Sequence, residues 1–195
     1  MAGAERHALG RRRAHLLDGL DGHVVDLGAG TGANLPHLGA AVSRVTALEP
    51  SPPMAARLRR RAARWQEQHD AEVTVIEAPA EAIPLPEGTA DAVVATLVLC
   101  TVDDATLAIR EIRRVLRDDG VLVLIEHVAS DQPVAGRVQR ALAPAWRIVG
   151  RGCHLHRPTR SLLTAGGFDD AEVMPWTLPG GGPAAPAITG VAKPR

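Results

Sequence analysis

The stretch HVVDLGAGTGANL, residues 23–35, constrains the fold more than any other part of the chain. Its two valines fit the end of a buried strand, and Gly28, Gly30 and Gly32 follow as a turn free of side chains. Such a turn lets backbone N–H groups approach a ligand closely. An acidic residue at the end of the next strand completes the pattern of an adenosine-containing cofactor site, and Glu49 occupies that position.

Asp26 separates two classes of cofactor. The glycines also fit the dinucleotide pattern G-x-G-x-x-G/A, with Ala33 in the last position. A carboxylate just before the first glycine would repel the pyrophosphate of NAD, whereas it suits a cationic amine and a sulfonium. S-adenosylmethionine (SAM) has both groups and no phosphate. The residues therefore favour SAM over the nicotinamide cofactor of an oxidoreductase, and over a tight turn without a ligand.

Composition narrows the class of protein further. With 195 residues the chain is long enough for one α/β domain, and 46% apolar with 23% charged residues is typical of a globular protein. Zero net charge does not support nucleic-acid binding. No apolar run is long enough for a transmembrane helix, and the first residues do not have the pattern of a signal peptide. Two cysteines do not make a disulfide framework, so we expect a reducing, cytoplasmic compartment.

Apolar runs and helical periodicity alternate along the chain, which predicts an α/β fold: a Rossmann-like, doubly wound, mostly parallel seven-stranded sheet with helices on both faces. The predicted strands are 24–27, 45–48, 73–77, 91–99, 121–125, 171–176 and 188–192. The predicted helices are 4–20, 33–38, 55–69, 103–116, 133–146 and 158–165. We expect a single domain, 1–195, with an N-terminal helical segment 1–22 whose arginines 11–13 face solvent, and a substrate-side helical segment 129–170.

Four stretches, VVDLGAGTGANL, VTALEPS, DAVVATLVLC and EIRRVLRDDGVLVLIEHV, resemble class I SAM-dependent methyltransferases in order and spacing. TLVLCTV, IEHVA, PAW, GC-x-L-x-R and LLTAGGF are similar to the methyltransferase-like thiol S-methyltransferases. The likeness to phosphatidylethanolamine N-methyltransferases and quinone-ring C-methyltransferases is weaker. The animal thiol methyltransferases carry a hydrophobic N-terminal anchor that this chain does not show, so membrane attachment is not carried over.

The resemblance implies a set of cofactor-binding residues. It implies that the glycine turn with Asp26 and the later Leu97 lie at the methionine end, that Glu49 binds the ribose, and that Glu81 accepts from the adenine amine. The alternative for Glu81 is an exposed loop carboxylate. The complete set is Asp26, Gly28, Ala29, Gly30, Gly32, Glu49, Pro50, Ala80, Glu81 and Leu97.

Methyl transfer from a sulfonium is an in-line displacement, so alignment and exclusion of water matter most. His127 follows an apolar strand and is the candidate base, because an imidazole titrates near neutral pH. Glu126 is the second candidate catalytic residue: it either orients His127 or binds backbone. The expected acceptor-binding residues are Cys100, Trp146, Cys153 and Arg157. Arg157 would pair with a substrate anion or a structural carboxylate.

No metal is expected, because the cluster Cys153-His154-Leu155-His156 is an incomplete ligand set. The sequence thus predicts a SAM-dependent methyltransferase that converts SAM to S-adenosylhomocysteine and methylates a small molecule, with a thiol as the leading acceptor. Two alternatives remain. One is N-, O- or C-methylation of a metabolite, quinone or lipid headgroup, and the other is a non-catalytic SAM-binding partner protein. The oligomeric state and the pathway are not predicted.

Overall fold

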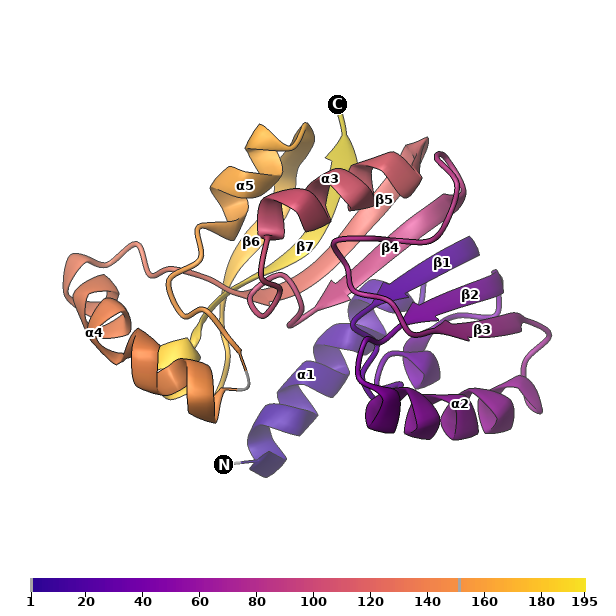
Figure 1. Cartoon of the computed structure of the whole chain (residues 1–195), viewed down its shortest axis with the longest axis horizontal. Coiled ribbons are helices and arrows are strands. Elements are labelled where there is room, and N and C mark those ends of the chain that lie inside the picture. Colours follow the sequence, from indigo (N-terminus) through magenta and orange to yellow (C-terminus); the bar gives the residue numbers. More distant parts are fainter. Residues whose placement is uncertain (1, 151) are drawn as a thin grey trace.

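The computed structural model describes residues 2–150 and 152–195, which form one sheet flanked by helices (Figure 1). The strands are β1 (Gly22–Leu27), β2 (Val42–Leu48), β3 (Glu72–Ile76), β4 (Ala90–Thr96), β5 (Leu116–His127), β6 (Phe168–Thr177) and β7 (Pro186–Pro194). The helices are α1 (Ala2–Leu17), α2 (Pro52–Gln66), α3 (Ala105–Val115), α4 (Pro133–Val149) and α5 (Thr159–Ala165), with 3₁₀ helices η1 (Leu35–His37) and η2 (Gly182–Ala184).

The strand order is β3-β2-β1-β4-β5-β7-β6. The strands β1 to β5 run parallel, while β7 is antiparallel to both β5 and β6. The predicted doubly wound, mostly parallel sheet is therefore confirmed. The carboxyl ends of the five parallel strands share one edge, and the chain reverses its direction of winding between β1 and β4. Ligands of open α/β sheets bind at such a reversal.

Alternate residues of the central strands pack into two cores on opposite faces of the sheet. Val25 and Val93 join the core that α3 and α5 cover, whereas Val24 and Val94 join the core under α1 and α2. Figure 1 shows these helix pairs on the two sides of the sheet. Both faces of β1 and β4 are buried, which is why these strands appear as continuous apolar runs in the sequence.

Several local predictions are wrong. The predicted strand 91–99 ends at Thr96, because the chain turns away after β4. Residues 33–38 form no α-helix but only the single turn η1, with a proline in its first turn. The glycine turn runs on to Asn34, whose side chain donates to Asp26, so too few residues remain for a longer helix before β2. Arg13 is not on a solvated face: it is half-buried, and its Nε donates to Asn34 Oδ1 at 2.8 Å.

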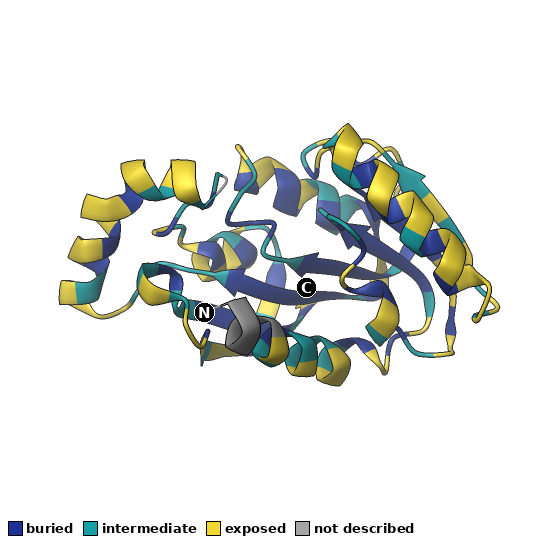
Figure 2. Ribbon diagram, turned by 90° about the horizontal axis from the view of Figure 1, so that it is seen from below, coloured by how far each residue is buried: buried dark blue, intermediate teal, exposed yellow. Residues whose placement is uncertain are grey.

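The helix α4 stands apart from the sheet (Figure 1) and is exposed along most of its length (Figure 2). Pro144 lies inside it without ending it, which corrects the expectation that the helix stops at residue 146. None of the helices that the structure describes combines the length and apolarity needed to cross a bilayer.

Candidate cofactor and acceptor site

A cavity of about 750 Å³ opens at the carboxyl edge of the sheet, where β1 and β4 part. Another cavity, of about 530 Å³, lies beside residues 128–132 and 157–161, away from the glycine turn. The first cavity contains seven of the predicted cofactor residues: Gly28, Gly30, Glu49, Pro50, Ala80, Glu81 and Leu97. Sequence reasoning missed its other lining residues: Met54, Pro79, Val98, Thr101, Val102, Asp103 and Gly150. The predicted Asp26, Ala29 and Gly32 support the turn without lining the cavity.

The glycine turn is pressed against the turn that follows β4. Gly28 has a φ of +52°, and a Cβ built on it would lie 2.6 Å from Val98 Cγ2. Any larger residue would thus be strained and would displace Val98 from the cavity wall. The glycine at this position is required by close approach as well as by backbone conformation.

Glu49 binds backbone on both sides of the cavity mouth. Its Oε2 accepts from the Gly30 amide at 2.9 Å, and its Oε1 accepts from the Ser51 amide at 2.9 Å. The side chain is 6% exposed. A carboxylate oxygen accepts more than one hydrogen bond, so each oxygen retains capacity for a ligand hydroxyl.

Asp26 is buried at the end of β1 and is only partly satisfied. Its Oδ1 accepts from Asn34 Nδ2 at 2.8 Å, and its Oδ2 has no hydrogen-bond partner. Burial raises the pKa of Asp26 to about 7, although Asn34 and the charge of Arg13 act in the opposite direction. A cation beside this carboxyl would favour its ionised form.

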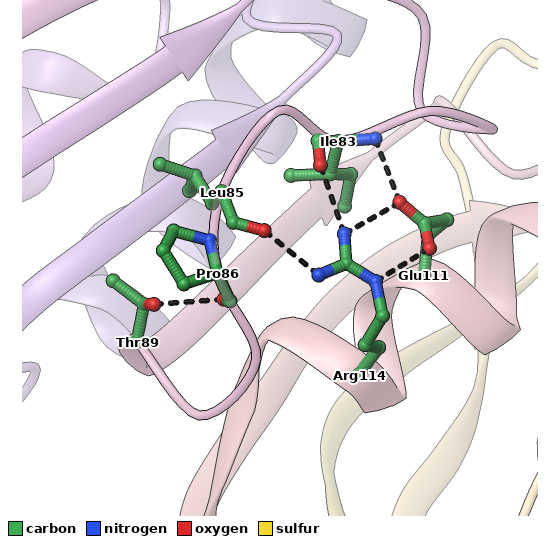
Figure 3. Close-up of polar contacts among 6 residues, drawn as sticks. All are labelled: Ile83, Leu85, Pro86, Thr89, Glu111 and Arg114. Atoms are coloured by element: carbon green, nitrogen blue, oxygen red, sulfur yellow. Dashed lines mark hydrogen bonds and ion pairs between the residues drawn. The ribbon is translucent and has the colours of Figure 1, made fainter.

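An ion pair on α3 holds the loop between β3 and β4 (Figure 3). The Arg114 guanidinium donates to Glu111 and to the carbonyls of Ile83 and Leu85, at 2.7 to 2.9 Å. Glu111 in turn accepts from the Ile83 amide at 2.9 Å, and Arg114 lowers the pKa of this carboxyl by hydrogen bonding. The clamp fixes the loop that brings residues 80 and 81 to the cavity.

Glu81 links this loop to the start of α3. Its Oε1 accepts from the amides of Asp103 and Asp104, at 2.9 and 3.3 Å. Glu81 is thus a half-buried loop carboxylate with backbone partners, and its contact with the adenine amine stays a prediction.

Glu126 anchors the turn after β4 from the neighbouring strand. Its carboxylate accepts from the consecutive amides of Val98, Leu99 and Cys100, at 2.8, 2.8 and 3.1 Å. Complete burial raises the pKa of Glu126 to about 7, against the effect of these three donors. Of the two roles expected for Glu126, backbone binding is the one observed. Leu97, which begins this turn, is the one non-glycine residue with positive φ among the described residues.

Two of the predicted acceptor-side residues, Cys100 and Cys153, lie close to His127. Cys153 Sγ lies 3.5 Å from His127 Nδ1, and Cys100 completes a group whose ligand-type atoms all lie within 4.8 Å of one another. Contact with Cys100 and with the nearby His127 lowers the pKa of the Cys153 thiol. Trp146 Nε1 is buried without a hydrogen-bond partner among the described residues. His127 Nε2 is buried and without a partner among the described residues.

Arg157 serves the backbone. Its Nη1 donates to the carbonyls of Leu99 and Val102, at 2.7 and 2.8 Å, and no carboxylate among the described residues pairs with it. The expected contact with a substrate anion stays a prediction. The His154 amide adds a bond to the Cys100 carbonyl at 2.7 Å. These bonds fasten the segment after α4 to the turn after β4, and thereby bring Cys153 beside Cys100.

The sheet order, the glycine turn and the buried carboxylate after β2 define an α/β domain built for an adenosine cofactor. The family described as "Methyltransferase domain" matches residues 25–124. The chain belongs to this family and has the fold of SAM-dependent methyltransferases.

Two relatives and one solved structure extend the comparison. The chain is 37% identical to the human thiol S-methyltransferase TMT1B over 80% of its own length, and 31% identical to a phosphatidylethanolamine N-methyltransferase of Cereibacter sphaeroides over 68%. It spans 65% and 64% of the lengths of these relatives. Geranyl diphosphate methyltransferase in complex with SAM shares the fold, with a TM-score of 0.70 and 16% identity, over 96% of this chain and 85% of that one.

Replacing Glu126 tests its structural role. Glu126→Gln puts an amide N–H₂ against backbone donors and removes the charge that accepts them. We expect the free energy of unfolding, measured by urea denaturation, to fall by about 1–3 kcal/mol. Glu126→Ala should lower it further. Glu77→Gln, which breaks an exposed ion pair with Arg59, is the control and should change stability by less than about 0.5 kcal/mol. An unchanged midpoint for Glu126→Gln contradicts the anchoring role.

The raised pKa of Asp26 predicts a pH dependence of stability. Between the ordinary pKa of an aspartate, 3.8, and about 7, the folded protein keeps a proton that the unfolded chain has released. Stability without SAM should therefore fall as pH rises through this range. Asp26→Asn should reduce the slope by up to about 1.4 kcal/mol per pH unit, measured by urea denaturation at several pH values. A slope identical to that of the original chain would rule out the proton uptake by Asp26.

Proposed function

We propose that this chain transfers the methyl group of SAM to the sulfur of a small thiol and releases S-adenosylhomocysteine. The observation that carries the proposal is the cavity at the carboxyl edge of the sheet, which Glu49, the glycine turn and the turn after β4 line together. Family membership supports the methyl donor. The name of the human relative, a thiol S-methyltransferase, supports sulfur as the acceptor atom.

The residues around the cavity fit a cationic adenosine cofactor. We assign the ribose hydroxyls to the two oxygens of Glu49, which the amides of Gly30 and Ser51 already orient. Asp26 is buried and does not line the cavity, and its charge and unpartnered Oδ2 are assigned to favour the positive methionine end. Glu81 Oε1 is occupied by the two amides that precede α3, so its Oε2 is assigned to the adenine amine.

SAM supplies an activated methyl group when it is bound. The chain must then align the acceptor, exclude water and remove the proton of the thiol. We assign removal of the thiol proton to His127, because its side chain has one unpartnered ring nitrogen and lies beside Cys153. Trp146, Cys100 and Cys153 form the acceptor end in this proposal, and Glu126 with Arg157 holds the turn on which that end is built.

N-methylation is the second candidate function, and the likeness to the phosphatidylethanolamine N-methyltransferase favours it. A panel of small thiols, amines and phenols with SAM separates the two functions. The proposal expects methylation of thiols; methylation of amines alone supports the second candidate. Binding of SAM without turnover on any member contradicts both and supports a non-catalytic partner.

The ribose assignment predicts the effect of Glu49→Ala. Loss of a charged acceptor should weaken SAM binding by about 1.5–3 kcal/mol, measured by isothermal titration calorimetry. Glu72→Ala is the matched control, because Glu72 begins β3 and its side chain is 66% exposed. Equal SAM affinity in folded Glu49→Ala and Glu72→Ala would refute the assignment.

The acceptor assignment predicts a selective kinetic loss in His127→Ala. With a methylated thiol from the panel, kcat/KM should fall about 10²–10⁴-fold, because the proton of the thiol is no longer removed efficiently. SAM affinity should stay within about twofold of the original, since His127 does not line the cofactor cavity. His156→Ala, on an exposed neighbouring residue, is the control. A folded His127→Ala variant with full activity at neutral pH contradicts the assignment, and one that loses SAM binding points to a structural role.

A further inference from the structure

The two cysteines of the chain and one histidine converge from three separate elements. Cys100 lies in the turn after β4, His127 ends β5, and Cys153 lies between α4 and α5. One sulfur, one ring nitrogen and the second sulfur lie within 4.8 Å of one another. The expectation of no metal was based on the local cluster 153–156, whereas the structure groups Cys153 with residues 26 and 53 positions earlier in the chain.

We propose that Cys100, His127 and Cys153 bind a thiophilic cation, of which Zn²⁺ is the probe, and that its fourth coordination position takes the acceptor thiol. Binding of the cation is independent of the function proposed above, while the role of the fourth position rests on it.

The observed spacing fits tetrahedral coordination. With Zn–S distances of about 2.3 Å and Zn–N distances of about 2.0–2.1 Å, a sulfur and a nitrogen ligand lie about 3.5–3.6 Å apart. Cys153 Sγ and His127 Nδ1 are 3.5 Å apart. Two sulfur ligands would lie about 3.8 Å apart, which is inside the 4.8 Å limit of the group. Small rotations of side chains are therefore sufficient to complete the site.

The backbone around the three side chains is held firmly. Three amides of the turn that contains Cys100 bind the carboxylate of Glu126, the residue before His127. The Cys100 carbonyl accepts from the His154 amide at 2.7 Å, which fixes the position of the adjacent Cys153. Cys100 is 0% and Cys153 is 4% exposed. A site of this kind is preorganised, as metal sites require.

The donor set selects the type of cation. Two thiolates and an imidazole suit Zn²⁺ and other thiophilic ions, whereas Mg²⁺ and Ca²⁺ prefer oxygen ligands. Three protein ligands with an open fourth position are typical of catalytic zinc, since structural zinc sites carry four protein ligands. Thr101 and Gly150 line the cofactor cavity and are close in sequence to Cys100 and Cys153. The proposed ion therefore lies beside the wall of that cavity.

The chemistry balances without a further reactant. On binding, the two cysteine thiols release their protons to solvent, and the two thiolates neutralise the charge of a divalent ion. An acceptor thiol in the fourth position also loses its proton to solvent. Its sulfur then forms the bond to the methyl carbon as the carbon–sulfonium bond breaks. The product is a neutral thioether, which is a weaker ligand and leaves, while the oxidation state of the ion is unchanged. His127 then assists ionisation of the thiol as a ligand.

Metal binding by the full-length chain tests the proposal directly. The reduced protein is stripped with EDTA, loaded with Zn²⁺, separated from free ion by gel filtration and assayed by mass spectrometry of the elements. One equivalent of zinc is expected. Co²⁺ in place of Zn²⁺ should give the thiolate-to-cobalt charge-transfer absorption of a cysteine-ligated site. Cys100→Ser, His127→Ala and Cys153→Ser should each weaken zinc binding by at least about tenfold.

The neighbouring histidines supply matched controls. His154→Ala and His156→Ala should keep both the zinc stoichiometry and the cobalt band, because neither residue belongs to the group. Unchanged SAM affinity and unfolding temperature show that a variant is folded, and Cys100→Ala replaces Cys100→Ser if the serine disturbs the buried turn. The proposal is overturned if the reduced protein binds no stoichiometric zinc. It is also overturned if the three variants keep full affinity.

Kinetics separates this proposal from the proposed function. If the chain methylates a thiol, adding Zn²⁺ to the EDTA-treated protein should raise kcat/KM at least about tenfold, and Cys153→Ser should abolish this response. Thiol methylation without zinc binding overturns the metal site and leaves the proposed function standing. Stoichiometric zinc with no thiol turnover overturns the acceptor role of the fourth position and leaves the site itself intact.

Discussion

The buried carboxylate of Glu126 is the interaction on which both halves of the site depend. Three successive amides of the turn after β4 point at it, so the direction of the chain beyond β4 is dictated from the end of β5. A carboxylate that is completely buried loses its hydration, and several hydrogen bonds are needed to offset this loss. This turn supplies Leu97 and Val98 to the cavity and Cys100 to the group with His127 and Cys153, which is the proposed acceptor end. Removing the anchor would therefore disturb both binding regions together.

The cofactor half could be predicted from sequence because its residues follow strands directly. In a parallel sheet the carboxyl ends of neighbouring strands meet at one edge, so residues that follow β1, β2 and β4 must come together. Glu49 was identified in this way, and the structure places it at the cavity with the glycine turn. The strand pattern also sufficed for the fold, because buried parallel strands leave continuous apolar runs that local sequence reveals.

The acceptor half could not be predicted to the same degree, because it depends on contacts between distant segments. The charge of Arg157 suggests binding of a substrate, whereas in the structure its side chain binds two carbonyls more than fifty positions away in the chain. Arg13 was placed in solvent for the same reason, since nothing local shows that α1 packs against Asn34. Cys100 and Cys153 carry no common motif, and only the bonds between their segments make them neighbours. From sequence alone, a polar side chain that hydrogen-bonds to distant backbone groups cannot be distinguished from one that binds a ligand.

A series of hydrogen bonds runs from Arg13 through Asn34 to Asp26. Through it, the N-terminal helix influences the charge beside the glycine turn. Asn34 donates to Asp26 and accepts from Arg13, so one amide side chain is oriented from both sides. The Arg13 charge also favours the ionised form of Asp26, while burial opposes it more strongly. The pKa of Asp26 therefore lies near neutral pH, so that a nearby cation is enough to favour its ionised form. A ligand with a positive amine supplies such a cation, whereas a pyrophosphate would add a second negative charge beside a carboxyl that burial already disfavours as an anion. In the function proposed above, discrimination between the two cofactor classes therefore depends on the surroundings of Asp26 as much as on its place before the glycines.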